Sequence, residues 1–115
     1  MELFTDAVTA AVERALGGVA QRQRVSAANV ANVSTPGYQA QRVEFEESLA
    51  DAIDRGDPDS SSTSVTLANT PKNINGNNVL LDEETSILIT SGLQYEALVN
   101  ALNYKLGLIR TAVER

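Results

Sequence analysis

The sequence predicts a mainly α-helical protein in which two long terminal helices pair as a coiled coil, with a loop-rich middle segment that has room for a short helix and a little β structure. Three observations predict this fold: helical spacing of apolar residues near the N-terminus, the same spacing near the C-terminus, and a scarcity of apolar residues over 54–78. The 115 residues suit one domain. We expect 1–35 and 80–115 to form its helical core, with 36–79 as a flexible or extended insert.

The first predicted helix runs from about residue 3 to 33. Its apolar residues recur three and four positions apart, at Phe4, Val8, Val12, Ala15, Leu16, Val19 and Ala20. Thr5 or Asp6 can cap its start, and Gly17-Gly18 predicts either a kink or the close approach of a neighbouring helix. The helix should stop before Pro36-Gly37, because this pair suits the central positions of a type II turn.

The middle segment begins with a short predicted helix over 44–54 and then becomes polar. Residues 54–78 contain only four apolar members, one of which is Ile74, so they cannot bury enough surface to offset their own ordering. Val65-Thr66-Leu67 alternates as a short strand would, and Asn75-Gly76 signals a turn.

The last predicted helix spans 82–113, with Asp82 as its N-cap. Two apolar series, each seven residues apart, run along it and together predict a coiled-coil seam. The seam residues are Leu88, Gly92, Tyr95, Val99, Leu102, Leu106, Ile109 and Val113. A lone helix would leave this seam in water, so it must pair with the N-terminal helix or with another chain.

The composition excludes several classes of function. The chain has no His, Cys or Trp, which removes imidazole bases, thiolate nucleophiles and the usual zinc sites. The net charge of −6 comes from the acidic stretch 44–59, which argues against nucleic-acid binding and is best read as a solvated face. No apolar run is long enough to span a membrane, and the N-terminus lacks the pattern of a cleaved signal. We therefore expect no catalytic, cofactor-binding or metal site.

Residues 26–38 carry the most specific motif of the chain. They read Ser-Ala-Ala-Asn-Val-Ala-Asn-Val-Ser-Thr-Pro-Gly-Tyr, and the motif positions are Asn29, Ala31, Asn32, Thr35, Pro36, Gly37 and Tyr38. This stretch resembles the N-terminal signature of bacterial flagellar rod and hook proteins. The runs Asn-Gly-Asn-Asn-Val at 75–79, Leu-Asp-Glu-Glu at 81–84 and Leu-Gln-Tyr-Glu-Ala-Leu at 93–98 narrow the resemblance to flagellar basal-body rod proteins, and among them to the proximal rod proteins of the B type.

This resemblance implies a structural role in bacterial motility. Such proteins are exported through the flagellar type III apparatus without a cleaved signal peptide and polymerise into the helical rod that crosses the periplasm. The implied partners are other copies of the chain, other rod proteins, and the MS-ring and export-gate or junction proteins at the rod base. The rod would connect these to the distal rod and hook. We expect the motif residues to set how the N-terminal helix meets its neighbours.

Two other classes of function remain open from the residues alone. A soluble coiled-coil adapter that only dimerises would also use the seam, although the polar end of the first helix and the turn after it argue against this alternative. A hydrolase using carboxylates would need two acids converging in a cleft, whereas the acids here are dispersed along 44–59.

Overall fold

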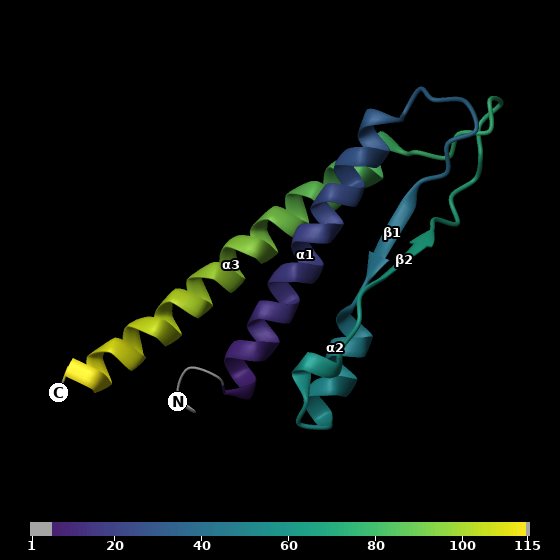
Figure 1. Ribbon diagram of the computed structural model, residues 1–115. Helices are drawn as coiled ribbons and strands as arrows, with labels where there is room; N and C mark the ends of the chain where they lie inside the picture. Colours follow the sequence, from purple (N-terminus) through teal and green to yellow (C-terminus); the bar gives the residue numbers. More distant parts are fainter. Residues whose placement is uncertain (1–5, 115) are drawn as a thin grey trace.

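The computed structural model describes residues 6–114 and shows two long helices lying side by side. Helix α1 spans Ala7–Ala31 and helix α3 spans Leu81–Glu114, and they run antiparallel along an elongated molecule of 65 × 26 × 14 Å (Figure 1). The predicted fold class is therefore confirmed: a mainly helical chain with paired terminal helices and a loop-rich middle segment that holds a short helix and two strands.

Helix α1 begins and ends where capping chemistry directs it. The Asp6 carboxylate accepts a hydrogen bond from the backbone N–H of Thr9 at 2.8 Å, which satisfies a donor of the first turn. Past the other end, the N–H of Tyr38 donates to the carbonyl of Thr35 at 3.2 Å, and Gly37 has a φ of 75°. A positive φ at this position is what a type II turn requires, so the predicted stop is confirmed.

The middle segment forms a two-stranded ribbon and a short helix. Strand β1 (Gln41–Glu44) pairs antiparallel with strand β2 (Ser64–Leu67), and helix α2 (Glu46–Asp54) and a 3₁₀ turn at Pro58–Ser60 lie between them in sequence. The short helix and the strand around Val65–Leu67 were both predicted. Strand β1 was not, because Val43 is its single apolar residue and gives no alternating pattern.

The apolar core lies between the middle segment and α1. Val19, Val43, Phe45 and Leu49 form a buried cluster, and Leu98 of α3 packs against it. A Cβ at Gly18 would overlap the ring of Phe45, so Gly18 makes room for an aromatic side chain rather than a neighbouring helix, whereas a Cβ at Gly17 would meet nothing within 4 Å. The boundary predicted between the 36–79 insert and a helical core stays a prediction. Three of the four core residues come from the insert: Val43 lies in β1, Leu49 lies in α2, and Phe45 directly precedes α2.

Helix α3 presents a contact face that leaves three of the eight predicted seam residues exposed. Of the predicted residues, Ile109 is buried, Leu88, Gly92, Val99 and Leu102 are partly buried, and Tyr95, Leu106 and Val113 are exposed. The positions that meet α1 and the core include Glu84, Ser91, Leu98 and Lys105, also seven apart. The helix pairing is thus as expected, with a rotated contact face.

None of the helices within residues 6–114 combines the length and the apolar character needed to cross a membrane.

Candidate functional site

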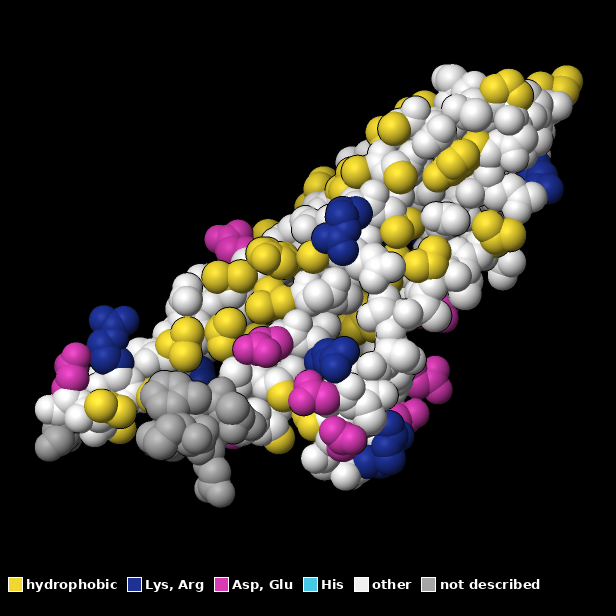
Figure 2. Space-filling model, viewed as in Figure 1, with side chains coloured by type: hydrophobic (Ala, Val, Ile, Leu, Met, Phe, Trp, Pro, Cys, Tyr) yellow, Lys and Arg dark blue, Asp and Glu magenta, His cyan; other side chains and the backbone are white. Residues whose placement is uncertain are grey.

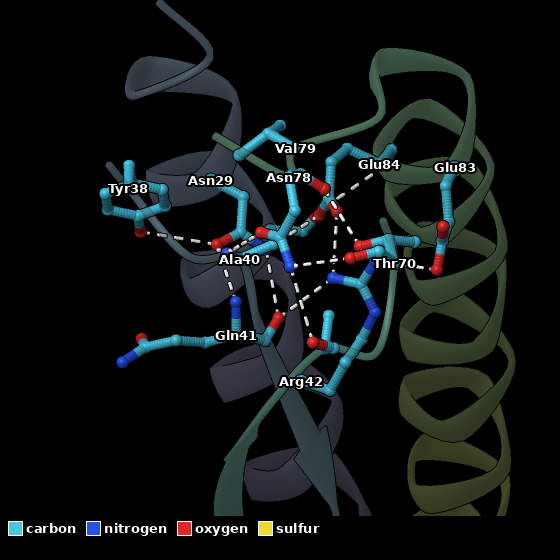
Figure 3. A network of polar contacts seen from close by, with 12 residues as sticks. Asn29, Tyr38, Ala40, Gln41, Arg42, Thr70, Asn78, Val79, Glu83 and Glu84 are labelled. Carbon is cyan, nitrogen blue, oxygen red and sulfur yellow. Dashed lines mark hydrogen bonds and ion pairs between the residues drawn. The ribbon is translucent and has the colours of Figure 1, made fainter. Parts of the chain in front are cut away.

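A polar junction of four side chains ties three elements together where α1 ends and α3 begins. Ser26 comes from α1. Figure 3 shows the other three: Asn29 from α1, Arg42 from β1 and Glu84 from the first turn of α3. The Glu84 side chain is fully buried, yet its carboxylate accepts hydrogen bonds from Ser26 Oγ at 2.8 Å, Asn29 Nδ2 at 2.9 Å and Arg42 Nη1 at 2.8 Å. These bonds and the Arg42 charge offset the cost of burying the carboxylate.

Asn29 uses the full hydrogen-bonding capacity of its side chain. Its Nδ2 donates to Glu84 and to the carbonyl of Gln41 at 3.0 Å, while its Oδ1 accepts from the Gln41 N–H at 3.0 Å and from the Tyr38 hydroxyl at 3.3 Å (Figure 3). An amide offers two donors and an oxygen with two lone pairs, and all four are used. Asn29 therefore pairs with both backbone groups of Gln41, as a residue of a neighbouring strand would, and so joins the start of β1 to α1.

A second asparagine, Asn77, connects the turn after α1 to the turn at Asn75-Gly76 by hydrogen bonds. Asn77 Nδ2 donates to the carbonyls of Asn32 and Thr35 at 2.9 and 2.8 Å, so it satisfies the end of α1 and the turn that follows. The N–H of Gly37 donates to the carbonyl of Asn75 at 2.9 Å. The turn predicted at Asn75-Gly76 thus lies directly against the Pro-Gly turn.

Asn78 extends the same connection to the strand. Its Oδ1 accepts from the N–H of Ala40 at 2.6 Å, and its Nδ2 donates to the carbonyl of Thr70 at 3.2 Å (Figure 3). Asn77 and Asn78 were not among the predicted site residues, although both are buried. The run Asn-Gly-Asn-Asn before an apolar helix was the available signal, since buried asparagines need specific partners.

The structure brings only part of the predicted motif into this junction. Asn29 is one of the four junction side chains and the Tyr38 hydroxyl donates to it, whereas Ala31, Thr35, Pro36 and Gly37 are exposed and Asn32 is partly exposed. Asn32 makes local bonds: its Nδ2 donates to the carbonyl of Ala28, and its Oδ1 accepts from the Thr35 hydroxyl. The role predicted for these residues in contacts with other subunits stays a prediction.

Ion pairs hold Arg42 at the junction and Glu46 near α2 in their ionised forms. Burial lowers the pKa of Arg42, but hydrogen bonds to Glu83 and Glu84 and their charges outweigh it and raise that pKa. Nearer to α2, the hydrogen bond from Arg22 lowers the pKa of Glu46. The same guanidinium lies 5.0 Å from the centre of the Phe45 ring, within cation–π range. Arg42 therefore links β1 to α3, and Arg22 links α1 to α2.

The geometry of the described residues suits mechanical connection better than chemistry. Glu84 is enclosed by its partners, and within residues 6–114 no group of three or more acidic side chains is placed to hold a metal ion. The junction instead links the ends of α1, β1 and the 77–79 segment to the start of α3, so that the two long helices have one register.

Comparison with known proteins identifies the family. The family model described as flagella basal body rod protein matches residues 13–39, which cover most of α1 and the Pro-Gly turn. The basal body rod protein FlgB of Bacillus subtilis (strain 168) is 33% identical over 98% of this chain and 97% of its own length. FlgB of Escherichia coli (strain K12) is 31% identical over 85% of this chain and 86% of its own. The chain belongs to the FlgB family of flagellar basal body rod proteins.

Membership of the FlgB family settles the class of function. A FlgB protein is a structural component of the flagellar basal body rod and not an enzyme, so the expected structural role is confirmed over the adapter alternative. The chain accordingly has its place in the flagellar basal body and assembles with other rod proteins. The resemblance seen in residues 26–38 lies within the stretch that the family model matches.

Proposed function

We propose that this chain is a subunit of the proximal rod, at the base of the drive shaft. There it packs against copies of itself and other rod proteins and lies next to the MS-ring and export-gate or junction proteins. It reaches this place through the flagellar type III apparatus without a cleaved signal peptide. Its two helices then form part of the wall of the rod, which connects the base to the distal rod and hook.

The exposed apolar side chains of distal α3 carry this proposal. Residues 106–114 continue beyond the ion pair between Lys105 and Asp6, where α1 begins (Figure 1). Leu106, Leu108 and Val113 are 43%, 52% and 64% exposed. Residues two apart on a helix point to nearly opposite sides, so Leu106 and Leu108 are not covered by one partner face. A helix that is apolar on several sides is suited to burial within an assembly.

A complementation experiment with Leu106→Gln tests this role. The host is a bacterium that has lost its motility because its own FlgB has been deleted, and the unsubstituted chain should restore rods in isolated basal bodies and swimming. Leu106→Gln should keep the helical circular dichroism of the purified chain, because the side chain is exposed, but lower the number of rods. Burying a leucine at a subunit contact is worth about 1.5–3 kcal/mol, which the variant loses.

Asn103→Gln is the matched control, since it is an exposed polar residue on the same helix and should leave rods unchanged. Normal rods with Leu106→Gln would contradict the assembly role of distal α3.

The proximal position has its own test: the chain should remain in basal bodies of cells that lack the distal rod proteins, and its mass there should show no removed leader. Loss of the chain from such basal bodies would contradict a proximal position.

A further inference from the structure

The hydrogen bonds of the β1–β2 ribbon show which backbone groups of β2 point away from β1. The N–H of Ala68 donates to the carbonyl of Ala40 at 2.8 Å, so these opposed residues form a hydrogen-bonded pair of the antiparallel ladder. Hydrogen-bonded and non-hydrogen-bonded pairs alternate along such a ladder. Val65 and Leu67 therefore belong to non-hydrogen-bonded pairs, and their backbone N–H and carbonyl groups point to the outer edge of β2.

The outer edge of β1 is covered by side chains of α1. Asn29 pairs with both backbone groups of Gln41, and Arg22 Nη2 donates to the carbonyl of Val43 at 2.6 Å. These side chains take the place that a further strand would have. Figure 1 accordingly shows β1 between α1 and β2.

The outer edge of β2 has no such cover. All four residues of the strand are exposed, and within residues 6–114 the outward backbone groups of Val65 and Leu67 form no hydrogen bond. The side chains of the same two residues are 42% and 58% exposed. Unpaired backbone groups beside exposed apolar side chains make this edge a template for another strand.

Strand β2 also lacks the charged residues and prolines that often protect an exposed edge from pairing. Residues 60–71 contain no charged side chain, and Pro71, the one proline among them, lies beyond the strand. Figure 2 shows charged side chains gathered around α2, whereas those over the β2 side of the ribbon are hydrophobic or uncharged. The edge is therefore suited to pairing with a strand that is itself uncharged.

The edge of β2 is complementary to that of a second copy. Two antiparallel copies related by a two-fold axis at Thr66 place Val65 of each chain opposite Leu67 of the other. Both pairs are then hydrogen-bonded, so every outward N–H and carbonyl group of these residues has a partner. The apolar side chains meet across the strands on one face. A shift of two residues would instead set one member of each pair opposite a residue outside the strand.

We propose that β2 pairs with β2 of a second copy, so that two ribbons join into one four-stranded antiparallel sheet. The occupant of the edge is a second copy because this register satisfies both edges at once and brings no like charges together. Such a contact is isologous and closes at two chains. Four residues from each chain make a small interface, which is typical of a transient pair.

The symmetry of this contact places it outside the rod. A rod that connects a base to a hook has two different ends, so its subunits point the same way along it, whereas the two-fold axis turns the paired strands in opposite directions. The pair therefore forms between chains that have not joined the rod, and it covers an edge that otherwise favours aggregation. This last step rests on the rod function proposed above.

Disulfide trapping of the purified full chain tests the register, because the chain has no cysteine of its own. Thr66→Cys sets the two thiols in a non-hydrogen-bonded pair with Cα atoms about 4.5 Å apart, which a disulfide can bridge. Ser64→Cys is the matched control, exposed on the same face of the same strand. Its two copies lie four residues apart along the strands, about 14 Å at about 3.4 Å per residue, and cannot be bridged.

Oxidised Thr66→Cys should give about tenfold more dimer than oxidised Ser64→Cys, because only the former has its thiols within reach. Equal yields would overturn the proposal.

Adding Val65→Pro to the Thr66→Cys chain tests the backbone bonds. The N–H of Val65 points away from β1, so proline removes a donor of the outer edge and no donor of the existing ladder. The yield of dimer should fall to that of the Ser64→Cys control, while the circular dichroism of the chain stays unchanged. An unchanged yield would show that the edge does not pair through its backbone and would overturn the proposal.

Basal bodies from the complementation strain test where the pair forms. With Thr66→Cys in the rod, oxidation of isolated basal bodies should give less than about a tenth of the dimer that the purified chain gives, because rod subunits are not related by this axis. As much dimer in basal bodies would overturn a pair of unassembled chains. Failure of the unsubstituted chain to restore rods, with the dimer still trapped in solution, would contradict the rod function alone.

Discussion

The two ends of the helix pair differ in how their surfaces are completed. At the junction end, the buried polar side chains of Asn29, Asn77 and Glu84 find their partners within one chain. At the other end, distal α3 exposes leucines and valine, and Thr9 Oγ1 is the one buried side-chain polar atom within residues 6–114 without a partner. The buried polar groups of the junction end are thus satisfied within the single chain, whereas the distal end carries surface suited to other subunits.

This difference separates specification of the fold from assembly. Polar groups buried at the junction penalise every other register, because a misplaced partner would leave a donor or acceptor unsatisfied at a cost of about 1–3 kcal/mol. Apolar side chains at the distal end are less selective about geometry, and they can pack against several partners. Substitutions at the junction should therefore act on the stability of the chain, and substitutions at the distal end on rods.

The largest effect on stability should come from Arg42→Gln. This variant leaves the fully buried Glu84 carboxylate without its counter-ion, and breaking a buried pair in this way typically costs about 3–5 kcal/mol. Urea unfolding of the purified chain, followed by circular dichroism, measures the loss. Arg24→Gln is the control, because Arg24 is exposed on α1 and has no ion-pair partner among residues 6–114. Equal stability of both variants would mean that the junction does not hold α3.

The next largest effect should separate the two motif asparagines. Asn29→Leu removes four hydrogen bonds and leaves the N–H and carbonyl of Gln41 without their partner, so it should cost more than about 2 kcal/mol. Asn32→Leu removes two bonds at a partly exposed position and should cost about 1 kcal/mol or less. The same urea experiment compares them. A larger loss for Asn32→Leu would place the register control at the end of α1 instead.

The contrast also explains which features the sequence could predict. Helix α3 was predicted from its heptads, and five of its eight predicted seam residues are buried or partly buried. The other contact positions include Glu84, Ser91 and Lys105, which no hydrophobic pattern selects. Glu84 is buried only because Ser26, Asn29 and Arg42 meet it there, and these residues are 42 to 58 positions away in sequence.

Local chemistry was the more dependable guide to the turns. Pro36-Gly37 and Asn75-Gly76 were both predicted as turns from backbone preferences alone, and both glycines have positive φ. That the two turns clasp each other could not be predicted, because it depends on the return path of the chain through β1 and β2. The site residues Asn77 and Asn78 were missed for the same reason.

A smaller effect on stability is expected at Gly18 of α1, and its neighbour Gly17 is the matched control, where the change in stability should have the opposite sign. Gly18→Ala forces the buried Phe45 ring to move, and such overpacking typically costs about 1–3 kcal/mol. At Gly17 a Cβ would meet nothing within 4 Å, so Gly17→Ala should stabilise the chain by about 0.5–1 kcal/mol through helix propensity. Thermal unfolding of both variants gives the comparison. Stabilisation by both would show that Phe45 does not pack against α1 as described.

The smallest effect concerns the ion pair that joins the start of α1 to α3 at the distal end. The hydrogen bond from Lys105, followed by that from the Thr9 N–H, lowers the pKa of Asp6 from 3.8 to about 2. Because the pKa is depressed in the folded chain, the pair stabilises the fold above about pH 4, and this contribution is lost as the pH falls from 3.8 through about 2. An NMR titration of the Asp6 carboxyl should show the low midpoint, and Lys105→Gln should raise it while Asp6 continues to cap α1. A midpoint that Lys105→Gln leaves unchanged would mean that the cap alone holds the carboxylate, and that α3 is not tied to the start of α1.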